Sequence, residues 1–318
     1  MLEIQSPIPP RLNIWADIAA FPGPPGLSCR MLNDSNNLRV FNNMAQFLVV
    51  KPVGGLANRI RAVTCGMWCA QELGMELILS WQCGDFMPAQ FSELFKNELN
   101  TDTRGLENCT KTSIEMGQLI QAKMIIDQSC ISDPGTAVIE IRTGVAFSYR
   151  PDVSPMQREF GDTIRPYLHA LIPVDSVAAE VRVNEQRFRE RVLGVHLRTG
   201  REQLSYHKSI EITEEPFFEA IDRAMTRING LGLYVASDSR ATISRFQQRY
   251  GSRALTLTRY GEDIPRHVDS ADAIRIALVE LMLLGRTHWL LGSVLSSFSE
   301  VASWYKRRAF SAIGTCRT

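Results

Sequence analysis

The sequence of 318 residues lacks several features that mark common protein classes. No apolar run approaches the roughly 20 residues of a membrane-spanning helix, and the N-terminus has no apolar signal-peptide core. Seven cysteines, an odd number in so long a chain, do not form a disulfide framework. The formal net charge is only +1, and no dense basic stripe points to nucleic acid. We therefore expect a globular cytoplasmic protein with no transmembrane segment and no nucleic-acid partner.

Two nucleotide-binding motifs and one metal-binding motif are also absent. No G-x-G-x-x-G follows the first predicted strand and no G-x-x-x-x-G-K-[ST] occurs, which argues against dinucleotide and P-loop sites. The chain has no Asp-x-Asp pair of the kind that holds a divalent metal against a diphosphate. A bound diphosphate would then need the fixed charge of an arginine in place of a metal. We expect no metal and no cofactor.

Short apolar runs alternate with helical periodicity from residue 47 onward, which predicts an α/β fold with parallel strands. In the first half, strands are predicted at 47–51, 76–80 and 137–141, with a helix at 57–73 that ends at Gly74. In the second half, strands are predicted at 192–198, 232–236, 255–257 and 288–291, and helices at 215–228, 243–250, 274–284 and 297–307. The stretch 97–128 has no readable pattern.

We interpret the chain as an arm followed by two domains. Residues 1–45, rich in proline and asparagine, form an irregular arm. Residues 46–189 form a first α/β domain and residues 190–318 a doubly wound second domain.

Polar groups follow three strands of the predicted second domain, at the edge where open parallel sheets bind ligands. His196 and Arg198 lie at the end of the first strand, and Asp238 follows the second. The last strand leads through Gly292-Ser-Val-Leu-Ser-Ser297 into a helix. A guanidinium grips two phosphate oxygens, and a helix start offers them free N–H groups. The pattern therefore favours a nucleotide diphosphate site.

Each of these groups has a structural alternative. Arg198 could make an ordinary salt bridge. A helix N-cap is an equally ordinary role for the polar residues after the second and third strands, namely Asp238, Ser239, Ser296 and Ser297.

Four short motifs occur in a fixed order along the chain. They are Gly54-Gly-Leu-Ala-Asn-Arg59, Gly194-Val-His-Leu-Arg198, Val235-Ala-Ser-Asp238 and Ser296-Ser-Phe-Ser299. Together, over residues 47–305, they resemble the α-1,2/α-1,6/protein O-fucosyltransferase superfamily. The His-x-Arg-x-Gly form is similar to its rhizobial nodulation branch. The resemblance implies a GT-B architecture, in which two Rossmann-like doubly wound domains face each other across a cleft.

The resemblance also implies an activity, namely the inverting, metal-independent transfer of L-fucose from GDP-fucose to a hydroxyl of a glycan or glycoconjugate. The implied catalytic residues are Arg198, at the donor diphosphate, and Asn58, which faces the donor across the cleft. The implied donor-binding residues are Gly54, Gly55, Arg59, His196, Asp238, Glu280, Ser296 and Ser297. Among these, His196 would lie near the guanosine, Glu280 would recognise guanine, and Ser297 would lie beside the phosphate.

Two alternatives stay open. The donor could be another GDP-hexose, such as GDP-mannose, or the protein could be a non-catalytic relative that binds GDP-sugars or glycans. The expected partners are in any case a nucleotide-sugar donor and a glycan acceptor. The acceptor has no readable motif, and the catalytic base has three equal candidates in Asp85, Glu140 and Asp152.

Overall fold

The computed structural model describes residues 45–316 except 86, 117–124, 134, 156, 158, 200–209, 258–269, 306–309 and 314. Apart from Ala45, the predicted N-terminal arm lies outside the described residues. The fold is mixed α/β and contains two parallel sheets, as the alternation of strands and helices predicts.

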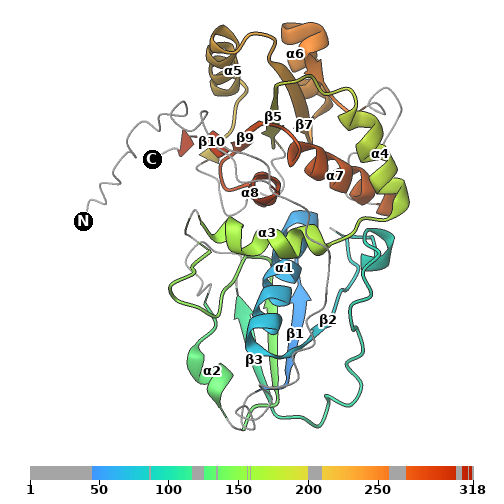
Figure 1. Ribbon diagram of the computed structural model, residues 1–318, viewed down its shortest axis with the longest axis vertical. Coiled ribbons are helices and arrows are strands. Elements are labelled where there is room, and N and C mark those ends of the chain that lie inside the picture. The colour runs from blue at the N-terminus through green and yellow to red at the C-terminus, as the bar shows by residue number, and fades with distance from the viewer. Residues whose placement is uncertain are drawn as a thin grey trace, which may run out of the picture. The chain divides into compact units, whose positions relative to one another are not determined.

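The first sheet has four parallel strands in the order β2-β1-β4-β3 (Figure 1). Its strands are β1 Phe47–Pro52, β2 Glu76–Leu79, β3 Lys111–Met116 and β4 Val138–Thr143. The central strand β1 is buried on both faces, with Leu48 and Val50 in the main core and Val49 in a second cluster. Burial on both faces explains its continuous apolar run.

Helix α1 (Leu56–Leu73) follows the glycine turn after β1 and ends at Gly74, whose φ of 66° confirms the predicted left-handed stop. The described residues of this part of the chain form four further helices, namely the short 3-10 helix η1 Phe91–Glu93, α2 Gln128–Ser132, α3 Phe160–Ala170 and α4 Asp175–Glu185. The sequence does not predict β3 or α3, and for α4 the alternation of arginine with Glu180 and Glu185 indicates a solvated helix face but not its bounds. The strand β3 has few apolar residues, and α3 carries Pro166 within the helix.

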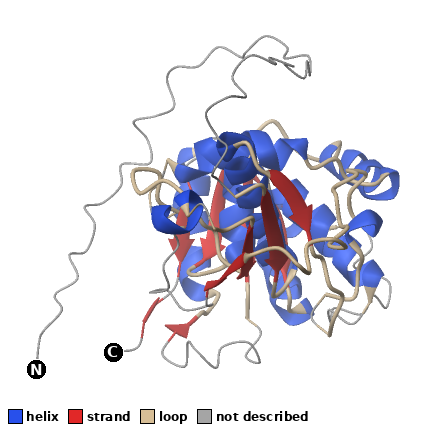
Figure 2. Ribbon diagram, turned by 90° about the horizontal axis from the view of Figure 1, so that it is seen from below, coloured by secondary structure: helices blue, strands red, loops and turns tan. Residues whose placement is uncertain are grey.

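The second sheet has five parallel strands in the order β10-β9-β5-β7-β8. They are β5 Val192–Leu197, β7 Gly232–Ser237, β8 Ala254–Leu255, β9 Trp289–Ser293 and β10 Phe310–Ile313. The helices among the described residues here are α5 Glu215–Arg227, α6 Arg240–Tyr250, the 3-10 helix η3 Gly251–Arg253, α7 Ala271–Leu284 and α8 Ser297–Trp304. A small antiparallel pair joins β6 Ile210–Glu211 to β11 Thr315–Cys316. Figure 2 shows helices on both sides of the strands.

Several predicted bounds need correction. The helix α8 ends at Trp304 rather than 307, and β8 covers two residues rather than 255–257. The strand β10 uses a C-terminal stretch that is too short to predict.

The strand order of the second sheet reverses beside β5. From β5 the chain builds outward through β7 to β8, and it then returns to the other side of β5 with β9 and β10. The reversal point lies between the carboxyl ends of β5 and β9. In open parallel sheets this is the place where a crevice for a ligand forms.

Helix α8 packs on helices of the first-sheet region (residues 45–170), as Figure 1 also shows. The rings of Phe160 on α3 and Trp304 on α8 meet edge to face, with centroids 5.8 Å apart. His169 and Arg165 on α3 hydrogen-bond to the carbonyls of Tyr305 and Trp304. One hydrophobic cluster therefore runs through both sheets.

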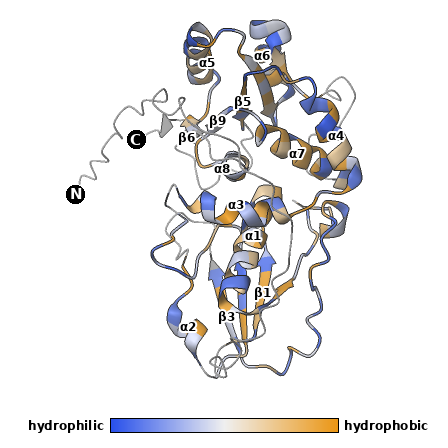
Figure 3. Ribbon diagram, in the orientation of Figure 1, coloured by the Kyte–Doolittle hydropathy of each residue, from blue (hydrophilic) through white to orange (hydrophobic). Residues whose placement is uncertain are grey.

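Helix α7 is largely hydrophobic (Figure 3), and its buried residues include Ile274, Leu278 and Leu281. It packs on α4, whose Glu185 pairs with Arg286 at 2.9 Å. None of the helices in the described parts of the chain is both long enough and apolar enough to cross a bilayer.

Candidate functional site

The loop after β5 is fixed from both neighbouring strands. The Oγ of Ser293, on β9, accepts a hydrogen bond from the backbone N–H of Arg198 at 2.9 Å and donates one to the His196 carbonyl at 3.3 Å. From the side of β7, the Asp238 carboxylate accepts hydrogen bonds from the backbone N–H of Thr199 at 2.8 Å and from its hydroxyl at 3.1 Å. The three predicted strand ends therefore meet, and Asp238 is engaged in holding the loop.

The side chain of Arg198 leaves this fixed loop half-buried. Among the residues that the structure describes, its guanidinium has no hydrogen-bond or ion-pair partner, so the predicted salt-bridge alternative is not seen there. A guanidinium always carries its charge, and a charge held partly out of water attracts an anion strongly. The position suits a phosphate.

His196 is buried, with 7% of its surface exposed. Its Nδ1 lies 2.8 Å from the Oγ of Ser299, and its ring stacks on Phe298 with centroids 4.7 Å apart. Burial, and then the nearby charge of Arg198, lower the pKa of His196 to about 4, against a smaller opposite effect of Asp238. The imidazole is therefore neutral at pH 7. Phe298 lies within a predicted motif, but nothing in the sequence signals the stacking.

The turn from β9 to α8 leaves a hydroxyl without a partner. Ser296 occupies the N-cap position of α8, yet its side chain makes no capping bond. Its buried Oγ has no hydrogen-bond partner among the described residues. The preceding Leu295 is 53% exposed and has a φ of 56°, a left-handed conformation that a non-glycine residue rarely adopts. Ser297 is the first residue of the helix.

The N-cap alternative is observed for a different residue. The Oγ of Ser239 accepts a hydrogen bond from the backbone N–H of Thr242 at 3.2 Å, at the start of α6. The hydroxyl of Ser296 thus differs from an ordinary helix cap, because it is buried and makes no capping bond.

Glu280 is a charged residue in the mostly apolar second half of α7. Its Oε1 is buried and accepts no hydrogen bond from any described residue. Burial, and then the charge of Asp238, raise the pKa of Glu280 to about 8. The helix packs on β5, β7 and α8, the same elements that carry the strand-end residues. Glu280 is therefore inward-facing and mostly protonated at pH 7, with an unsatisfied acceptor.

The glycine turn after β1 is held by Arg59. Its Nε donates to the Gly54 carbonyl at 2.8 Å, its Nη1 donates to the Gln82 carbonyl at 2.6 Å, and its guanidinium lies 5.0 Å from the centre of the Trp81 ring. Burial lowers the pKa of Arg59, with a smaller opposite effect of Cys83. These contacts hold the guanidinium against the backbone, so Arg59 supports the turn, and its contact with the donor stays a prediction. Gly55 has open space beside it.

Asn58 is connected to α8 through a residue that the sequence analysis missed. The Nη2 of Arg61 donates to the Oδ1 of Asn58 at 2.8 Å and to the Gly144 carbonyl at 2.7 Å. The Nη1 of the same guanidinium donates to Glu300, on α8, at 2.5 Å. Arg61 lies two residues beyond the first motif and Glu300 one residue beyond the fourth. Their closeness to these two motifs was the only sign in the sequence that Arg61 and Glu300 belong to the site.

The three candidate bases remain unassigned by geometry. Glu140 pairs with Lys51 at 2.8 Å, and Asp152 pairs with Arg150 at 2.5 Å. The hydrogen bond from Arg150 lowers the pKa of Asp152, against a smaller opposite effect of burial. Asp85 is exposed.

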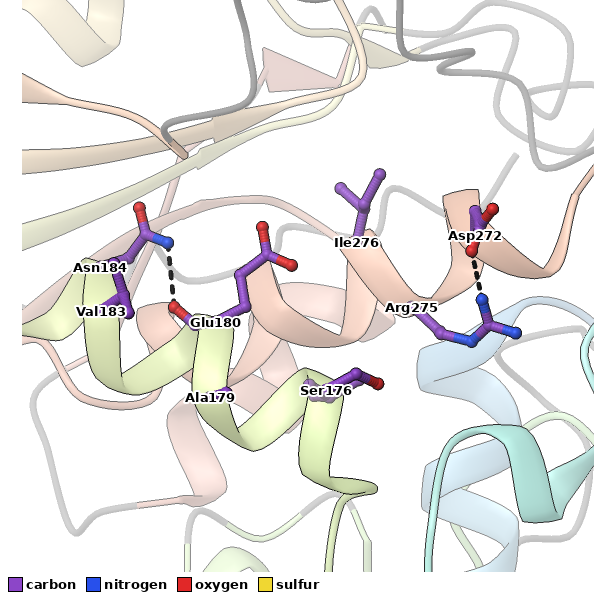
Figure 4. A pocket seen from close by; sticks show the side chains of 9 residues that line it. Ser176, Ala179, Glu180, Val183, Asn184, Asp272, Arg275 and Ile276 are labelled. Atoms are coloured by element: carbon purple, nitrogen blue, oxygen red, sulfur yellow. Dashed lines mark hydrogen bonds and ion pairs between the residues drawn. The ribbon is translucent and has the colours of Figure 1, made fainter.

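A groove of about 540 Å³ runs between α4 and α7 (Figure 4). Its wall includes Glu180, Asn184 and Arg275, and Figure 4 shows Arg275 paired with Asp272. No predicted site residue lines it, so we do not assign the donor to this groove. No group of three His, Cys, Asp or Glu side chains suited to a metal ion occurs in the described ranges.

No family model and no curated protein matches the sequence. Solved structures do match it. NodZ α-1,6-fucosyltransferase soaked with GDP-fucose aligns with a TM-score of 0.56 and 12% identity, over 86% of this chain and 100% of that one. A mutant of Arabidopsis thaliana FUT1 in complex with GDP aligns with a TM-score of 0.56 and 12% identity, over 84% of this chain and 69% of that one. POFUT1 in its apo form aligns with a TM-score of 0.54 and 13% identity, over 86% of this chain and 99% of that one.

The chain has the fold of these fucosyltransferases. The matches extend over both sheets, since they cover more than four fifths of the chain. The fold expectation from the four motifs is thereby confirmed at the level of a mixed α/β fold with two parallel sheets.

Proposed function

We propose that the protein is an inverting, metal-independent glycosyltransferase that transfers L-fucose from GDP-fucose to a hydroxyl of a glycan or glycoconjugate. The observation that carries the proposal is the half-buried guanidinium of Arg198, which has no partner among the described residues and lies where the strand order reverses. The known neighbours of this fold include a fucosyltransferase soaked with GDP-fucose.

The chemistry of the other strand ends supports a GDP-sugar. As the glycosidic bond of the donor breaks, negative charge appears on the leaving diphosphate. Arg198 would neutralise that charge, and the bare Oγ of Ser296 together with the start of α8 at Ser297 would donate to phosphate oxygens. The carboxyl of Glu280 would accept hydrogen bonds from the N–H groups of guanine. His196, neutral and fixed by Ser299, would pack near the guanosine.

The proposed architecture is GT-B, with two Rossmann-like domains at residues 46–189 and 190–318 that face each other across a cleft. Helix α4, which packs on α7, would connect them. In this arrangement Asn58, from the glycine turn of the first domain, approaches the donor from the side opposite to Arg198. Gly55, with open space where a Cβ would be, would allow the ligand to come close to the backbone, and Gly54 leaves room for the amide of Asn58.

The test is donor turnover by the Arg198→Ala variant. Loss of one charged donor at a developing oxyanion costs about 100- to 1000-fold in turnover. We expect a loss of this size in the release of GDP from GDP-fucose, with unchanged thermal unfolding. The matched control is Arg223→Ala, since Arg223 is an exposed arginine on α5 that pairs only with Glu219 in the described structure. Wild-type turnover in a folded Arg198→Ala variant would remove Arg198 from the mechanism.

The same assay separates the alternatives. Tight binding of GDP without release of sugar from any GDP-sugar would identify a non-catalytic binding protein. Faster turnover of GDP-mannose than of GDP-fucose would change the donor sugar while keeping the site. Transfer that EDTA abolishes and Mn²⁺ alone restores would contradict the metal-independent mechanism, because a metal would then supply the charge assigned to Arg198.

A further inference from the structure

Among the described residues, Arg61 links the glycine turn to the second-sheet region through polar contacts. Its guanidinium contacts Asn58, the Gly144 carbonyl and Glu300, which lies 239 residues away in the sequence. Its side chain is 13% exposed and that of Glu300 is 33% exposed. A link this well shielded is screened little by solvent, so its geometry is held more firmly than that of a surface ion pair.

The contact with Arg61 fixes which way the Asn58 amide faces. A guanidinium only donates hydrogen bonds, so the atom of Asn58 that faces it must be the carbonyl oxygen. The amide nitrogen Nδ2 then points toward Gly54, where an added Cβ would lie only 2.6 Å from it. Within the described structure no group accepts a hydrogen bond from Nδ2. Its two N–H donors therefore remain available on the side of the glycine turn.

Glu300 places the other end of the link at the start of α8. Its backbone N–H donates to the Ser296 carbonyl at 3.0 Å, so the carboxylate that holds Arg61 belongs to the first turn of the helix. Ser296 carries the bare hydroxyl described above. One guanidinium thus joins the amide of Asn58 to the helix start proposed to bind phosphate.

We propose that Arg61 is a positioning residue for the transfer reaction, and the proposal rests on the function proposed above. Held by Glu300 and the Gly144 carbonyl, Arg61 keeps the N–H groups of Asn58 turned toward the donor, where they donate to an oxygen of the diphosphate or of the sugar. It also ties the glycine turn to α8, so that Asn58 and Ser296 keep a fixed separation. Arg61 itself does not touch the substrate.

The first test is the Arg61→Lys variant. An ammonium keeps the positive charge near Glu300, but it lacks the planar fork that reaches acceptors in three directions. Misplacement of a positioning group by about 1 Å costs on the order of 100-fold in rate. We expect kcat for donor turnover to fall by about 10- to 100-fold. Since GDP is held mainly by the second-sheet region, we expect its Kd to change by less than about threefold, which is well below the rate effect.

The matched control is Arg275→Lys. Arg275 on α7 pairs with Glu93 of η1 at 3.1 Å, so it too joins the two sheet regions. Its side chain is 32% exposed, and it makes no contact with Asn58 in the described structure. We expect kcat to stay at the wild-type value. An equal loss in both variants would mean that any inter-region ion pair has this effect, and would overturn a specific role for Arg61.

A double-mutant cycle tests whether Arg61 acts through Asn58. If it does, adding Arg61→Lys to Asn58→Ala lowers kcat no further than Asn58→Ala alone. Fully additive losses would refute the proposal. The Glu300→Gln variant serves if Arg61→Lys does not fold, because the amide oxygen still accepts from Nη1 while the ion pair is lost. We expect it to lower kcat with the Kd of GDP preserved, and a wild-type kcat would contradict the link.

The outcomes separate the two levels of the proposal. If wild-type protein turns over a GDP-sugar and Asn58→Ala is slow, but folded Arg61→Lys has the wild-type rate, only the positioning role is wrong. If wild-type protein neither binds GDP nor releases it from any GDP-sugar, the proposed function is wrong, and the role of Arg61 fails with it.

Discussion

Replacing Glu280 by glutamine should remove most of the pH dependence of GDP binding between pH 6 and pH 8. Burial and the charge of Asp238 raise the pKa of Glu280 to about 8 in the free protein. Guanine presents N–H donors, and an ionised carboxylate accepts hydrogen bonds from them much better than a protonated carboxyl group does. Binding then favours the ionised form, so the affinity for GDP rises as the pH rises toward 8 and levels off above it.

The size of the effect follows from the ionised fraction. With a pKa of about 8, about half of the Glu280 side chains are ionised at pH 8, about 9% at pH 7 and about 1% at pH 6. Because only the competent fraction binds, affinity should fall about 50-fold from pH 8 to pH 6. In the Glu280→Gln variant a neutral acceptor replaces a charged one, so its affinity should not change with pH and should lie about tenfold below that of wild type at pH 8. The two affinity curves should cross, and the variant should bind about fivefold more tightly than wild type at pH 6.

Isothermal titration calorimetry measures both parts of this expectation. Titration with GDP at pH 6, 7 and 8 gives the affinity ratio of the two proteins, in which the titration of GDP itself cancels. Repeating the pH 7 titration in two buffers of different ionisation enthalpy counts released protons, and we expect about 0.9 proton for wild type and almost none from this site in the variant. Parallel affinity curves, or equal proton release, would refute the assignment of Glu280 to guanine.

Two further predictions concern the glycine turn and the buried histidine. Gly54→Ala should lower donor turnover at least tenfold, because the φ of Gly54 is 79° and the new Cβ would lie 2.6 Å from the Nδ2 of Asn58. Gly74→Ala is the control, because Gly74 has a φ of 66° and no atom near an added Cβ. It should cost about 1 kcal/mol of unfolding free energy without changing the rate of turnover. The pKa of His196 is lowered to about 4 from 6.5, so the stability that its neutral form contributes is complete above pH 6.5 and is lost as the pH falls toward 4. The raised pKa of Glu280 changes stability with pH in the opposite sense, so the Glu280→Gln background isolates the effect of His196. In urea unfolding, Glu280→Gln should lose about 2 kcal/mol of unfolding free energy between pH 7 and pH 5. The double variant Glu280→Gln/His196→Asn should not show this loss.

Much of the fold could be predicted because the central strands have a recognisable apolar sequence pattern. The runs at β1, β5 and β7 are continuous and apolar, as strands buried on both faces must be. The edge strand β3 has no such apolar run, so its polar sequence does not identify it as a strand. Helix α3 carries a proline that normally argues against a helix interior.

The candidate site divides in the same way. Parallel strands bring their carboxyl ends to one edge, so the meeting of His196, Arg198 and Asp238 follows from strand order alone. The link from Arg61 to Glu300 has no periodic signal, because it depends on how two helices far apart in the chain pack together. Whether Glu280 faces inward depends on a rotation of α7 that its nearly uniform apolar sequence leaves open.

The packing of α8 on α1 and α3 has a consequence for folding during synthesis. The first-sheet region supplies its own strands and helices early, but Trp304 and Glu300, which contact Phe160 and Arg61, leave the ribosome more than 100 residues after α3. Until then Trp68 on α1 packs on one part of the Phe160 ring, but the part that Trp304 contacts has no native cover, and exposed apolar surface favours aggregation. Contacts of such long sequence separation also slow folding. Chains released before α8 is complete should therefore be insoluble, even though they contain the whole first sheet.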